Sequence, residues 1–84
     1  MDNEKVIVIF NMVNRGKTED LELPLDISVN ELVMALNVAY ELDLDLSDIK
    51  NCYLKTENPI AFLKGNRTLR EFGMRNGTVI NYTE

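Results

Sequence analysis

The stretch Ser28–Leu42, SVNELVMALNVAYEL, carries the clearest helical pattern in this 84-residue chain. Ser28 and Glu31 have the spacing of a capping box, in which each side chain bonds the backbone amide of the other residue and fixes the start of a helix. Apolar residues then recur at intervals of three and four and form one stripe, namely Val29, Leu32, Val33, Leu36 and Tyr40. A helix this short is marginal alone in water, so we expect the stripe to pack against another layer.

Two strands are predicted before this helix. Lys5–Met12, KVIVIFNM, is rich in β-branched residues, and Asn11 marks its outward face. The other face then points toward the helix and consists of Val6, Val8, Phe10 and Met12. Val13–Lys17 has the composition of a hairpin loop, and Thr18–Leu25 alternates as a second strand. Pro24 cannot donate a ladder hydrogen bond, which places this second strand at an edge of the sheet.

Three further strands are predicted after the helix, at Cys52–Thr56, Ile60–Lys64 and Thr78–Thr83. Ser47 or Asp48 is expected to cap one helical turn before them, and Thr68–Phe72 to form another turn capped through Thr68 and Glu71. A right-handed crossover from the second strand through the helix then gives a single domain, 1–84, of the α+β class. The predicted architecture is a β-grasp roll, a mixed sheet packed on one main helix with its first and last strands side by side in the centre.

Composition limits the partners of the chain. Nine basic against fourteen acidic side chains give a formal net charge of −5, which disfavours nucleic acid and anionic membrane surfaces. A local basic cluster is either a solvated face or an anionic docking spot, and it consists of Lys64, Arg67, Arg70 and Arg75. No apolar run has the length of a membrane span and no secretory signal is recognisable, so we expect a soluble, cytoplasmic protein without membrane insertion.

Catalytic and metal-binding patterns are missing from the sequence. The chain has no histidine, and its one cysteine, Cys52, shares a strand face with Leu54, as a packed thiol would. Asp43, Asp45 and Asp48 lack the glycine and the chelating glutamate of a calcium loop. We therefore expect no enzyme activity, no cofactor and no metal site.

Two apolar surfaces are candidate protein-binding sites. The first is the open sheet face, where Ile7 and Ile9 should neighbour Val79 and Asn81, and the second is Met34 with Val38 on the water-facing side of the helix. Each is either a partner contact, a homodimer interface included, or a set of ordinary exposed side chains. If the first surface binds a partner, Ile7→Asp or Ile9→Asp should leave a folded monomer that has lost that partner.

The sequence resembles the YukD/EsaB-type ubiquitin-like proteins of Gram-positive type VII secretion systems, which export WXG100 proteins. The similar stretches are Asp20–Pro24 running into Val29–Leu32, and Thr68–Gly77. The segment Gly65–Phe72, with its turn, Arg-Thr-Leu and aromatic residue, also resembles the ubiquitin pattern before the last strand. The resemblance implies a cytosolic, non-enzymatic accessory or regulatory protein whose partners are components of the secretion machinery.

One departure from ubiquitin separates the alternatives. Conjugation and sulfur transfer need a C-terminal Gly-Gly tail, whereas this sequence ends Asn81-Tyr82-Thr83-Glu84. We therefore expect non-covalent binding rather than the action of a covalent modifier or sulfur carrier. A generic adaptor domain unrelated to secretion is the other alternative.

Overall fold

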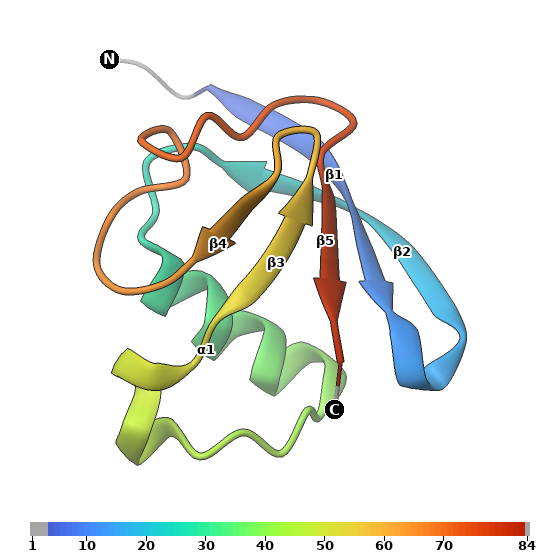
Figure 1. The fold of residues 1–84 in the computed structure, drawn as a ribbon, viewed down its shortest axis with the longest axis vertical. Coiled ribbons are helices and arrows are strands. Elements are labelled where there is room, and N and C mark those ends of the chain that lie inside the picture. The colour runs from blue at the N-terminus through green and yellow to red at the C-terminus, as the bar shows by residue number, and fades with distance from the viewer. Residues whose placement is uncertain (1–3, 84) are drawn as a thin grey trace.

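The computed structural model describes residues 4–83, which form one mixed sheet with a main helix packed on one side of it (Figure 1). The elements are β1 (Lys5–Met12), η1 (Val13–Arg15), β2 (Lys17–Pro24), α1 (Val29–Tyr40), η2 (Leu46–Asn51), β3 (Leu54–Glu57), β4 (Ala61–Leu63) and β5 (Val79–Tyr82), where η marks a 3-10 helix. The strand order is β2-β1-β5-β3-β4; β1 and β5 are parallel, and the other pairs are antiparallel. The predicted β-grasp roll of the α+β class is confirmed.

The side chains of the two central strands, β1 and β5, point to the predicted faces of the sheet. β1 has the predicted bounds, and its helix-facing side chains Val6, Val8, Phe10 and Met12 are all buried. Ile80 and Tyr82 of β5 are buried on the same side of the sheet, as their alternation predicted. β2 lies at an edge, the position that Pro24 required.

Polar groups fix both ends of α1. The capping box is present: Ser28 Oγ accepts from the Glu31 amide, and Glu31 Oε1 accepts from the Ser28 amide, each at 3.1 Å. The buried stripe consists of Val29, Leu32, Val33 and Leu36, with Tyr40 partly buried beside it. At the other end, Arg15 donates to the carbonyls of Tyr40 and Glu41 at 2.8 and 3.1 Å. The β1–β2 turn therefore supplies partners for carbonyls that the end of a helix leaves unpaired.

The cap predicted for the turn after α1 is wrong. Asp45, and not Ser47 or Asp48, is the N-cap of η2. Asp45 Oδ1 accepts from both the amide and the hydroxyl of Ser47, at 3.1 and 2.6 Å, and these bonds hold the pKa of its carboxyl below the ordinary value. The carboxylate two residues before Ser47 reaches these donors, so the turn begins earlier than expected.

All four strands after β1 differ from their predicted bounds by one or two residues at their ends; β2 and β5 are Lys17–Pro24 and Val79–Tyr82 rather than Thr18–Leu25 and Thr78–Thr83. β3 begins at Leu54 rather than Cys52, because the Cys52 amide donates to the Ile49 carbonyl at 2.9 Å and closes η2. β4 is shorter than Ile60–Lys64 and pairs with β3 only over its three residues. Cys52 is half-buried against the core, in agreement with a packed thiol.

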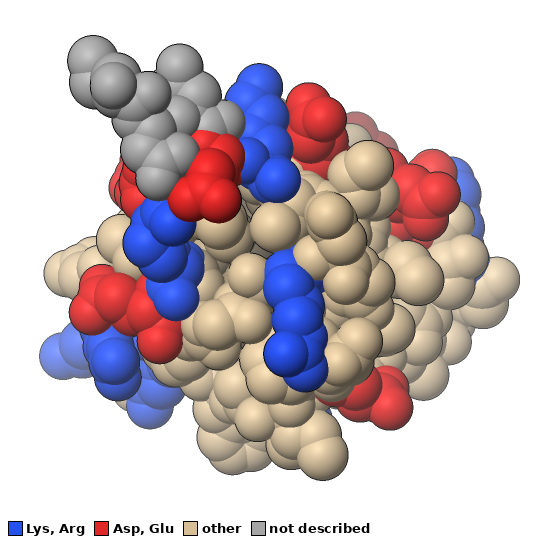
Figure 2. All heavy atoms as spheres, turned by 90° about the horizontal axis from the view of Figure 1, so that it is seen from above, with Lys and Arg blue, Asp and Glu red and all other residues tan. Residues whose placement is uncertain are grey.

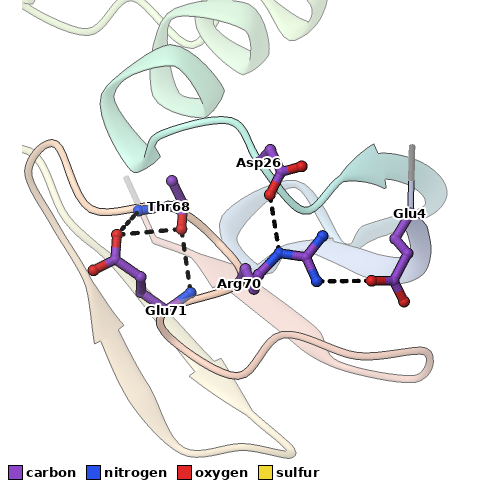
Figure 3. Close-up of polar contacts among 5 residues, drawn as sticks. All are labelled: Glu4, Asp26, Thr68, Arg70 and Glu71. Atoms are coloured by element: carbon purple, nitrogen blue, oxygen red, sulfur yellow. Dashed lines mark hydrogen bonds and ion pairs between the residues drawn. The ribbon is translucent and has the colours of Figure 1, made fainter. Parts of the chain in front are cut away.

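The segment between β4 and β5 closes one end of the core. Leu69 is fully buried, and its amide donates to the Ile27 carbonyl at 3.0 Å. The predicted cap is present, since Thr68 Oγ1 accepts from the Glu71 amide at 3.2 Å and Glu71 Oε1 accepts from the Thr68 amide at 3.0 Å (Figure 3). The residues after Thr68 form hydrogen-bonded turns rather than a helix.

Candidate protein-binding surface

The open face of the sheet lies opposite α1 and carries the first candidate surface (Figure 1). Parallel pairing of β1 with β5 sets Ile9 beside Val79 and Asn11 beside Asn81. Ile7 is 52% exposed, while Ile9, Val79 and Asn81 are half-buried by their neighbours. The structure therefore brings the four residues predicted from the sequence onto one face, with Ile7 as the most exposed of the four.

Polar residues border this aliphatic strip. Asn11 Nδ2 donates to Asn81 Oδ1 at 2.9 Å, and Asn81 Nδ2 donates to Glu57 Oε2 at 2.8 Å. The Asn81 side chain thus belongs to a hydrogen-bonded row across three strands. The cross-strand neighbours of Ile7 and Ile9 on β2 are Glu22 and Asp20. We define Ile7, Ile9 and Val79 as the aliphatic strip; on β2 it is bordered by Asp20 and by Glu22, which pairs with Lys5 at 3.9 Å.

The second predicted surface lies on the solvent side of α1. Met34 is 43% and Val38 76% exposed, one turn apart on the helix. The helix buries its other side against the sheet, so this surface and the aliphatic strip lie on opposite sides of the molecule (Figure 1).

A further exposed apolar group was missed from the sequence. Tyr53 and Phe62 are 53% and 62% exposed, and their rings contact each other with centroids 5.2 Å apart. Lys55, paired with Phe62 across the strands, places its ammonium 5.8 Å from the centre of the Phe62 ring. The inward phase of Leu54 was a usable signal that Tyr53 points outward. Ala61-Phe62-Leu63 is apolar throughout, so its phase was not readable without the β3–β4 pairing.

The basic cluster predicted near the C-terminus is divided among separate contacts. Arg70 forms ion pairs with Asp26 at 2.9 Å and Glu4 at 2.7 Å, between the start of β1 and the β2–α1 connection (Figure 3). Arg67 lies 3.6 Å from Glu71. Figure 2 shows acidic and basic side chains interspersed on one face, with a basic side chain also lying within the broad area that other residues form. Carboxylates thus compensate part of the cluster, which favours the solvated-face interpretation over an anionic docking spot.

The possible metal ligands of the described chain are engaged in local contacts. Cys52 Sγ lies 3.8 Å from the Asp48 carbonyl oxygen. Asp45 and Asp48 accept hydrogen bonds from Ser47 and Asn51. Within residues 4–83, no three His, Cys, Asp or Glu side chains converge as metal ligands would, and no helix has the length and apolarity needed to cross a bilayer.

Comparison with solved structures supports the fold. The chain is similar to the C-terminal ubiquitin-like domain of mouse tubulin-specific chaperone e, with a TM-score of 0.76, 14% identity, and coverage of 99% of this chain and 89% of the other. It is also similar to a de novo designed protein based on ubiquitin, with a TM-score of 0.63, 14% identity, and coverage of 92% and 84%. At this identity the likeness establishes the ubiquitin-like fold alone.

Comparison with families gives the identity that the fold leaves open. No curated protein matches the sequence. The family model described as "WXG100 protein secretion system (Wss), protein YukD" matches residues 7–81. These residues include the whole of α1 and all five strands apart from the ends of β1 and β5. The chain therefore belongs to the YukD family of the WXG100 protein secretion system.

Proposed function

We propose that this chain is a non-enzymatic, cytoplasmic accessory protein of a WXG100, or type VII, secretion system, and that it acts by non-covalent binding to another component of that system. Membership of the YukD family links the chain to WXG100 secretion. The observation that carries a binding role is the aliphatic strip, which lies on a sheet face that no helix of residues 4–83 covers (Figure 1).

The chemistry of the aliphatic strip indicates the kind of contact it would make. Ile7, Ile9 and Val79 offer apolar area on rigid neighbouring strands, so little side-chain entropy is lost when a partner covers them. Glu22 and Asp20 border the strip on β2. Lys5 pairs with Glu22, so a partner with an apolar centre and a basic group facing Asp20 complements this surface.

Affinity capture from the native host tests the proposal. Tagged protein should retain secretion-system subunits in native washes and lose them in denaturing washes, because the association is non-covalent. Adducts that survive denaturation would instead support the covalent modifier or sulfur carrier. Capture of proteins unrelated to secretion would support the generic adaptor.

A matched pair of variants connects this capture to the surface. Ile7→Lys adds a charge to the centre of the strip, whereas Val13→Lys adds the same charge to another exposed aliphatic residue, in η1. We expect Ile7→Lys to lose the captured subunits and Val13→Lys to retain them. Retention by both variants would contradict binding through the open sheet face.

The helix surface is the second candidate, because its exposed residues lie one turn apart on a regular helix. Val38→Asp should leave the fold intact, since Val38 is 76% exposed. If Met34 and Val38 bind a partner or a second copy, the variant loses that partner in the capture experiment or changes the molar mass measured by light scattering. If neither changes, this surface has no binding role.

A further inference from the structure

The open sheet face has a second half with a different character. Tyr53, directly before β3, and Phe62, in β4, form a ring pair that lies outside the core, with both residues more than half exposed. Aromatic residues are enriched at protein interfaces because they bury a large area for two rotatable bonds. Lys64 follows β4 and continues the outward phase of Phe62. We define Tyr53, Lys55, Phe62 and Lys64 as the aromatic–lysine patch.

The aromatic–lysine patch is basic on an acidic protein. Lys55 lies over the Phe62 ring, and within residues 4–83 neither Lys55 nor Lys64 forms an ion pair. The carboxylates of the open face lie toward the other edge, on β2, apart from Glu57, which is engaged by Asn81. Within residues 4–83, Asp20 and the Lys5–Glu22 ion pair lie beside the aliphatic strip, whereas Lys55 lies over the Phe62 ring without an ion pair.

A hollow adjoins the Tyr53 end of the patch. It has a volume of about 280 Å³, and Tyr53 and Lys55 contribute to its rim. Its apolar lining comes from α1, the segment after α1 and β3, through Val33, Leu44 and Leu54. This volume is below the usual range of small-molecule pockets and suits one apolar side chain of a protein partner.

We propose that the aromatic–lysine patch binds an acidic segment of a partner protein, with the carboxylates of that segment on Lys55 and Lys64 and one apolar side chain in the hollow beside Tyr53. Charge complementarity selects this occupant, because the two ammonium groups attract carboxylates while the net charge of −5 repels acidic segments elsewhere. The inference rests on the proposed function for the identity of the partner, but its test does not.

A peptide titration tests the patch directly. The probe is the synthetic peptide Glu-Glu-Leu-Phe-Glu-Glu, added to ¹⁵N-labelled full-length protein, with Lys-Lys-Leu-Phe-Lys-Lys as its charge-reversed control. We expect the acidic peptide to shift the amide signals of Tyr53, Lys55 and Phe62. Phe62→Ser and Lys55→Glu should each weaken its binding about tenfold. Lys17→Glu carries the same charge change on β2 at the opposite edge and should bind as the wild type does.

Several outcomes would overturn the inference. They are equal binding of both peptides, shifts centred on Ile7 and Ile9, or no shift up to the solubility limit of the acidic peptide. Concentration-dependent self-association that Phe62→Ser abolishes would show a second copy in the patch in place of a partner. Melting curves should show that Phe62→Ser is folded, because the side chain it removes is 62% exposed.

Capture from the host separates this inference from the proposed function. If Phe62→Ser retains the secretion subunits and Ile7→Lys loses them, the inference fails and the proposed function stands. If the acidic peptide binds the patch but wild-type protein captures no secretion subunit, the proposed function fails and the inference stands.

Discussion

Ile7→Asp and Ile7→Lys form a pair of variants that tests both the sheet register and the proposed binding face. Ile7 is 52% exposed, so about half of the roughly 1.5–3 kcal/mol gained by fully burying an aliphatic side chain is lost in either variant, or about 1 kcal/mol. Antiparallel pairing sets Ile7 opposite Glu22. Aspartate at this position therefore adds a like-charge cross-strand pair that costs about 0.2–1 kcal/mol, whereas lysine adds an opposite-charge pair.

These values give an ordered expectation. Ile7→Asp should lose about 1–2 kcal/mol of the free energy of unfolding, which lowers Tm by about 5–15 °C for a domain of this size. Ile7→Lys should lose about half as much. Both variants stay folded, because a small domain has about 5 kcal/mol or more of stability. Both should lose the partner, since each places a charge in the aliphatic strip.

Thermal unfolding, monitored by circular dichroism, measures the loss of stability. Capture of secretion subunits measures the loss of the partner. Equal losses of Tm in the two variants would refute the cross-strand charge argument. An unfolded Ile7→Asp protein would refute the estimate from half-burial. Folded variants that both retain the partner would refute binding through the aliphatic strip, whatever their stability.

Substitutions at three further positions test contacts that hold the fold. Ser28→Ala removes the acceptor of the capping box and should lower the free energy of unfolding by about 1 kcal/mol in urea denaturation; an unchanged midpoint would contradict the role of the cap. Thr78 is fully buried and donates to the Asn58 carbonyl at 2.7 Å, so Thr78→Val should cost about 1–3 kcal/mol, and Thr78→Ser, which keeps the hydroxyl, should cost less. Hydrogen bonds from the Thr68 amide, above all, hold the pKa of Glu71 below its ordinary value. The stability from Glu71 is therefore complete above the ordinary pKa and is lost as pH falls through the lower pKa of the folded state, so Glu71→Gln should flatten the acid side of the stability curve. If NMR shows that the pKa of the Glu71 carboxyl is at or above its ordinary value, this reasoning is contradicted.

Local patterns were sufficient for most of the fold. The capping box, the stripe of α1 and the bounds of β1 follow from side-chain chemistry and periodicity within a few residues, and the structure has all three. The N-cap of η2 was not predicted correctly. Asp45, Ser47 and Asp48 can all serve as N-caps, and only the path of the chain into η2 selects Asp45. The edge position of β2 was also readable, since the missing amide of Pro24 excludes it from a central strand.

The sequence predicted the candidate surfaces only in part. Alternation from Asn11 placed Ile7 and Ile9 on the open face, and the β-grasp topology added Val79 and Asn81 beside them. Exposure was not readable, because it depends on which neighbours cover each side chain; Ile7 and Ile9 have the same phase but different exposure. The distribution of the basic cluster also depends on residues distant in sequence, as the ion pair of Arg70 with Glu4 shows.

The sequence by itself determined the helix, the strand faces and the order of elements, because these depend on interactions between residues a few positions apart. The tertiary structure alone decided that Tyr53, Lys55 and Phe62 form one patch beside a hollow, and that Asp20 and Glu22 lie beside Ile9 and Ile7 on the other half of the same face. Such groupings arise from cross-strand register, which a short apolar run such as β4 does not specify until it has a partner strand.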